Sequence, residues 1–140
     1  MNAKFYLSAL AGTVTTFLLG WLIYGILLKG FSEANTIHYE GLMPEMPNMF
    51  LLILSNLFMA LFIAFVFQRW AGFNTFRNGL FGGMIIGFFI SAAFDLSMFS
   101  MMNLVTPVFL IVDILVYTFM TGITGGVIAA VQGYGKNKGT

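Results

Sequence analysis

The sequence predicts an all-α, polytopic membrane protein, with four transmembrane helices in an up-down bundle that forms one domain over residues 1–140. Hydrophobic residues make up 59% of the chain and charged residues only 8%, and the mean hydropathy is +0.93. A soluble domain of this size carries about 25% charged residues. The apolar residues also fall into runs long enough to cross a bilayer. We therefore expect lipid to be the solvent of this chain.

Charged residues define the first two spans. Lys4 and Lys29 enclose an uncharged run over residues 5–28. At about 1.5 Å per helical residue this run reaches about 36 Å, which is enough to span a bilayer with some tilt. A second apolar run follows the acidic loop residue Glu45 and predicts a span over residues 48–69.

The second half of the chain contains an apolar stretch that is far too long for one helix. We expect it to break at Thr106 and Pro107, because a threonine can cap a helix and a proline suits its first position. This break predicts a third span over residues 78–102 and a fourth over residues 107–132.

The basic residues of the short loops predict the orientation of the spans. Five of them fall on one side of the membrane: Lys4, Arg69, Arg77, Lys136 and Lys138. The other side holds only Lys29. Because Lys and Arg are enriched in cytoplasmic loops, we expect both termini in the cytoplasm and the loop over residues 30–47 on the outer side, as a solvated connector.

Small residues form stripes on the last two spans. The third span carries them at four-residue intervals, at Gly79, Gly83, Gly87 and Ser91, and the fourth carries Gly122 and Gly126. Such stripes let two helix backbones approach closely in lipid. We expect them to pack within the bundle, and a seam between the protomers of a homo-oligomer is the alternative.

Two acids lie inside the predicted spans. Asp95 and Asp113 are each nine residues from Leu104, at the turn between the third and fourth spans, which places them at equal depth. Asn56 and Tyr24 reach a similar depth on the second and first spans. We expect these four side chains to form a polar layer. Helical geometry places Asp113 almost opposite the glycine stripe of its own helix, which would give the two acids different neighbours.

No Lys, Arg or His lies inside a span to neutralise these acids. An uncompensated charge at the bilayer centre costs about 2.5–3.5 kcal/mol even on the lenient insertion scale. Either the carboxyl groups are neutral and fix helix packing, or they exchange a proton or cation with solvent. The first hypothesis describes a non-transporting accessory subunit. The second describes a membrane protein that binds or passes a proton or small solute, and we favour it because acids within spans are typical of function.

The outer loop contains a histidine and regularly spaced methionines: His38, Met43, Met46 and Met49. Thioether and imidazole groups suit soft cations such as Cu(I). With ten methionines in the chain, we interpret this spacing as coincidental and keep a soft-metal site as the less favoured hypothesis.

Composition excludes several other classes. The chain has no cysteine and therefore no disulfide or thiolate nucleophile. Its net charge of +1 does not provide a basic surface for nucleic acid. One histidine and no serine in a nucleophile-elbow pattern leave little from which to build an enzyme. We predict no enzymatic activity and no cofactor.

Three segments carry a resemblance to a known group: Trp21-Leu22-Ile23-Tyr24-Gly25-Ile26-Leu27-Leu28-Lys29, Asp95-Leu96-Ser97 and Val112-Asp113-Ile114. They resemble small four-helix bacterial membrane proteins of unknown function. That group typically has Tyr, Thr or Asn near the first Asp and Trp after the second, where this sequence has Phe94, Ser97 and Tyr117. The resemblance implies a location in the bacterial inner membrane and supplies no substrate.

Overall fold

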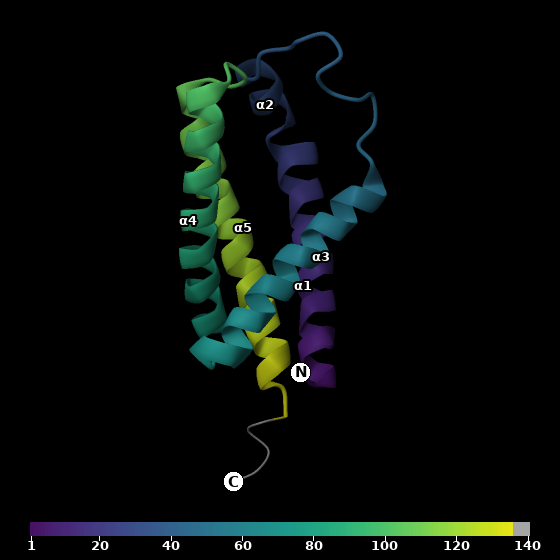
Figure 1. Ribbon diagram of the computed structural model, residues 1–140, viewed down its shortest axis with the longest axis vertical. Helices are drawn as coiled ribbons and strands as arrows, with labels where there is room; N and C mark the ends of the chain where they lie inside the picture. The colour runs from purple at the N-terminus through teal and green to yellow at the C-terminus, as the bar shows by residue number, and fades with distance from the viewer. Residues whose placement is uncertain (136–140) are drawn as a thin grey trace.

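The computed structural model describes residues 1–135 and contains five α-helices and two single π-helical turns (Figure 1). In chain order these are α1 (Ala3–Leu22), η1 (Ile23–Leu27), α2 (Lys29–Asn35), α3 (Met49–Val66), η2 (Phe67–Ala71), α4 (Phe76–Met101) and α5 (Pro107–Gly133). Lys136 and Lys138, used above to predict orientation, lie outside the described residues.

Four helical segments are long and apolar enough to cross a membrane: Ala3–Leu27, Met49–Ala71, Phe76–Met101 and Pro107–Gly133. The all-α class is therefore confirmed, and each end of these four segments lies within two residues of the corresponding predicted span. In two of the four, a π-helical turn completes the span.

Side-chain caps fix where all four long helices begin, and at α1 the side chain of Asn2 accepts a hydrogen bond from the backbone of Phe5 at 3.2 Å. The side chain of Asn48 accepts a hydrogen bond from the backbone of Leu51 at 3.1 Å, and that of Thr106 accepts one from Phe109 at 3.2 Å. Pro107 occupies the first turn of α5, as predicted. Thr75 caps α4 in the same way. Each cap satisfies a backbone donor that has no partner within its own helix.

The most closely packed part of the structure lies where α1 begins and α5 ends, which we call the terminal end. Its buried residues come from α1, α3, η2 and α5: Phe5, Ala9, Ala60, Ile63, Ala64, Phe67, Ile128 and Ala129. The buried side chain of Gln132 on α5 donates to Ser8 on α1 at 3.2 Å and to the Ala64 carbonyl on α3 at 2.9 Å. One amide therefore ties three helices together.

Helices α4 and α5 pack against each other through their glycines. A Cβ atom added to Gly83 would overlap the Thr121 carbonyl oxygen, and one added to Gly125 would lie 2.5 Å from the Gly79 carbonyl oxygen. Gly126 packs beneath the ring of Phe76. The small-residue stripe is therefore covered by its own chain, and the predicted packing within the bundle is what the structure shows.

The opposite end of the molecule, which we call the loop end, is held together differently. Helix α2 and the residues after it lie against the turn between α4 and α5. The backbone of Ile37 donates to the Leu104 carbonyl at 2.7 Å, and that of Thr106 donates to the Asn35 carbonyl at 3.0 Å. The loop over residues 30–47, predicted as a solvated connector, thus begins with a short helix that pairs with the turn, and its residues are exposed or half-buried.

Helix α3 runs diagonally across the bundle (Figure 1). Its second half is buried at the terminal end, where Ala60 and Ile63 are fully enclosed. Its first half leaves the bundle, so that Phe50 is 72% exposed and Leu51 58% exposed. The loop end of the bundle is consequently formed by α1, α4 and α5, with little cover from α3.

Candidate functional site

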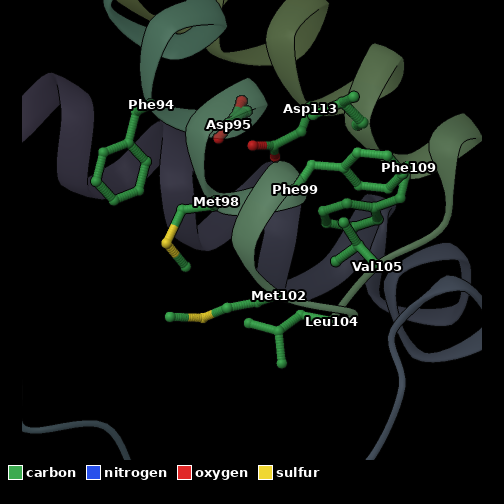
Figure 2. Close-up of a pocket in the computed structure, with 10 residues that line it drawn as sticks. Phe94, Asp95, Met98, Phe99, Met102, Leu104, Val105, Phe109 and Asp113 are labelled. Carbon is green, nitrogen blue, oxygen red and sulfur yellow. The ribbon is translucent and has the colours of Figure 1, made fainter.

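Asp95 on α4 and Asp113 on α5, the acid pair, point their carboxyl groups toward one another at the loop end (Figure 2). They come together because the two helices form a hairpin whose turn lies midway between them in the sequence. Their equal depth was predicted from that spacing. Both residues are half-buried rather than fully enclosed.

The expectation that the two acids have different neighbours was wrong, because both acids line the same cavity and the same groove. That expectation counted residues on straight helices. A four-residue stripe that begins at Gly79 has rotated by about 160° when it reaches Asp95, and Asp113 lies about half a turn from Gly122 on its own helix. Counting along straight helices therefore does not show which side chains meet near the turn.

Tyr24 joins the acid pair from the first span. Its hydroxyl group donates a hydrogen bond of 2.6 Å to Oδ1 of Asp113. Tyr24 lies in η1, where the backbone of Leu28 bonds to the Ile23 carbonyl at 2.7 Å instead of following the α-helical pattern. Such π-helical turns occur often at functional sites. Tyr24 is therefore a member of the site, as predicted.

Asn56, the fourth predicted member, does not reach the site. It lies on the first half of α3, which tilts away from α4 and α5, and its side chain has no hydrogen bond to any residue in the described range 1–135. Tyr117 occupies the neighbourhood instead. It lies one turn after Asp113 and lines a groove of about 380 Å³ with both acids, Ile90, Ser91 and Phe94.

A cavity of about 140 Å³ extends from the acid pair toward the turn at the loop end (Figure 2). Its walls are Phe94, Asp95, Met98, Phe99, Met102, Leu104, Val105, Phe109, Leu110 and Asp113. The two carboxyl groups are the ionisable side chains in this wall. Oδ2 of Asp95 is enclosed and accepts no hydrogen bond from any described residue.

The charges around the acid pair are all of one sign. No Lys, Arg or His lines either the cavity or the groove. Two carboxylates held this closely repel each other, and neither has a basic partner to offset the loss of water. Two ionised carboxylates in this arrangement would therefore carry an uncompensated cost.

The soft-metal residues of the outer loop remain apart from this site. His38 and Met49 are exposed, and Met43 and Met46 are 71% and 79% exposed. Within residues 1–135 no three His, Asp or Glu side chains gather into a group that could hold a metal ion.

No protein-family model matches the sequence, and no similar protein was found among the curated proteins or the solved structures.

Proposed function

We propose that this chain is a multi-pass membrane protein whose acid pair binds or passes a proton or small solute. One observation carries the proposal: two carboxyl groups face each other inside the spans, beside a cavity, without a basic residue near them. Acids within membrane spans are typical of ion and proton pathways. A close pair of carboxyl groups can hold one proton between them and release it when a cation takes its place.

The placement in the membrane is part of this proposal. Arg69 in η2 and Arg77 at the start of α4 flank the loop at the terminal end, and α1 begins at that end with Lys4 in its first turn. Positive residues favour the cytoplasmic side, so we propose an up-down bundle with the terminal end in the cytoplasm. The resemblance noted above supports a bacterial inner membrane as the location, with lipid as the surrounding partner. A homo-oligomeric assembly is part of the same proposal.

A specific contact favours a second candidate function. The hydrogen bond from Tyr24 to Asp113 ties the first span to the last. If the acids serve only to hold helices in this way, the chain is a non-transporting accessory subunit. The two candidates differ in one measurable property, which is whether the carboxyl groups change their protonation while the protein stays folded.

Infrared difference spectroscopy of the protein in lipid tests this property during a pH titration. The proposal predicts a carboxyl band that titrates and that disappears in the double variant Asp95→Asn, Asp113→Asn. Glu33→Gln is the matched control, because Glu33 is an exposed acid outside the spans. It should leave that band in place. The melting temperature of the double variant should stay close to that of the native chain, since Asn has a similar volume and still accepts from Tyr24.

Flux measurements in proteoliposomes complete the test. The double variant should lose proton or solute flux while it remains folded. If no carboxyl band moves over the pH range in which the protein is folded, the proton-binding proposal is wrong and the accessory-subunit function is favoured. A titrating band without flux would identify a binding protein rather than a transporter.

A further inference from the structure

The cavity beside the acid pair has a lining suited to one class of ligand. Apart from the two carboxyl groups and aliphatic side chains, its walls consist of aromatic rings and thioethers: Phe94, Phe99, Phe109, Met98 and Met102. Figure 2 shows these side chains around one space, with the acids at its end. Aromatic faces attract cations that have lost their water, and sulfur is a polarizable neighbour. The lining therefore favours a positively charged organic group.

The same lining is unsuitable for the hard divalent cations Ca²⁺ and Mg²⁺. Ca²⁺ requires 6–8 oxygen ligands, and Mg²⁺ requires a near-ideal octahedron of them. The cavity offers oxygen from Asp95 and Asp113 and otherwise mainly carbon and sulfur. No three-residue metal group exists within residues 1–135. An ammonium group that carries methyl substituents needs no such oxygen shell, because its charge is spread over an apolar surface.

The volume of the cavity limits the size of the ligand. A cavity of about 150 Å³ in another protein holds benzene, and this one is about 140 Å³. It therefore fits an ion of about six or seven heavy atoms. One end is closed by Leu104 and Val105, which pair with the segment after α2. The side is open, where Phe94 is 64% exposed and Met102 is 47% exposed.

We propose that this cavity binds a small alkylammonium ion, with its charge against the acid pair and its alkyl groups against the aromatic rings. This inference rests on the proposed function and names its ligand class. Binding is an exchange: the ammonium ion enters, one proton leaves the acid pair for solvent, and the net charge of the site is unchanged. The ammonium can belong to a free ion or to a lipid headgroup that reaches the open side of the cavity.

Choline and its neutral carbon analogue 3,3-dimethylbutan-1-ol form a matched pair of probes, since they have the same shape and differ in charge. The native protein is studied in maltoside detergent, which contains no ammonium group. Calorimetry should show binding of choline and not of the alcohol. A weakly buffered sample should show release of about one proton per choline bound, as expected for an exchange with a shared proton.

Dihexanoylphosphatidylcholine, added as a monomer, tests whether the ammonium group comes from a lipid headgroup. Tighter binding of this lipid than of choline would assign the site to a headgroup, and the reverse would assign it to a free ion.

Two variants separate the ring contribution from general packing. Phe109→Leu removes a ring from the cavity wall and should weaken choline binding by about three- to thirty-fold, which is the range from an exposed to a desolvated cation–π contact. Phe119→Leu is the control, because Phe119 lies on the same helix, is 59% exposed and lines no part of the cavity. It should leave choline affinity unchanged. The double variant Asp95→Asn, Asp113→Asn should abolish both choline binding and proton release.

The outcomes distinguish this inference from the proposed function. If the carboxyl band titrates but choline neither binds nor releases a proton, the ammonium proposal is wrong and the proton-binding proposal stands. Equal binding of choline and its neutral analogue, or choline binding that survives in the double Asn variant, would also overturn the ammonium site. If no carboxyl band titrates, both proposals are wrong.

Discussion

The contact between α4 and α5 allows a stability prediction that depends on backbone geometry alone. A Cβ atom at Gly83 would overlap the carbonyl oxygen of Thr121 and lie 3.1 Å from Cα of Gly122. Both neighbours are backbone atoms, so neither can rotate away. Gly20, on α1, differs: a Cβ atom there meets only the flexible end of Met120, at 3.7 Å. Alanine should therefore be harmful at position 83 and harmless at position 20.

The magnitude follows from two opposing contributions. Replacing a helical glycine by alanine stabilises a helix by about 0.5–1 kcal/mol, because the unfolded chain loses freedom. This gain applies to Gly83→Ala and Gly20→Ala alike and cancels in their difference. Overpacking a close contact costs about 1–3 kcal/mol. Because the obstructing atoms at Gly83 belong to the backbone, we expect the free energies of unfolding to differ by about 2–3 kcal/mol, the upper part of this range.

Unfolding by sodium dodecyl sulfate in mixed micelles, followed by circular dichroism, measures this difference. Light scattering on the same samples records the mass of the protein–detergent complex. Gly20→Ala should be at least as stable as the native chain, and Gly83→Ala should be less stable without a change of oligomeric state. Equal stability of the two variants would refute the close packing of α4 on α5. A smaller complex for Gly83→Ala alone would instead place this glycine at a contact between protomers.

Three further predictions concern individual contacts and the topology. Tyr24→Phe removes the hydroxyl group that donates a hydrogen bond to Asp113. A double-mutant cycle with Asp113→Ala should therefore give a coupling energy of about 0.6–1.7 kcal/mol in detergent. A coupling energy of zero would contradict the contact. Gln132→Leu leaves the polar partners of a buried amide unsatisfied and should lower the free energy of unfolding by about 1–3 kcal/mol. An unchanged denaturation midpoint would argue against the two hydrogen bonds of this amide. In intact cells, Met43→Cys should react with an impermeant maleimide and Asn74→Cys should not, and the opposite labelling pattern would reverse the proposed orientation.

Helix boundaries and the depth of the acids could be predicted from the sequence because both depend on position along the chain. Charged residues mark where a span leaves the apolar region, and Lys4 and Lys29 enclose the first one. Thr106 and Pro107 mark the start of the last helix through local chemistry, which requires no knowledge of the neighbours. The equal depth of the two acids follows from counting residues on either side of a turn.

Tilt and rotation of the helices could not be predicted in this way. Asn56 has the depth expected for the polar layer, but α3 leans away from α4 and α5, and depth alone does not bring two side chains together. The π-helical turn that contains Tyr24 has no clear sequence signal. Tyr117 could have been found from the sequence, because it lies one turn from Asp113 on the same helix face.

The chemistry of the site favours exchange over a purely structural role. A tyrosine hydroxyl can donate to an amide oxygen as well as to a carboxyl oxygen, so Asn at position 113 would tie the same two helices with no charge to bury. Asp113 carries the additional cost of a titratable group inside a span, about 2.5–3.5 kcal/mol when it is ionised, and Asp95 adds a second such cost beside it. The packing of the terminal end through glycines and Gln132 does not depend on either acid. A Tyr–Asn contact could hold the two helices together, but only a pair of acids can also take up and release a positive charge. The cavity beside the pair provides a place for that charge.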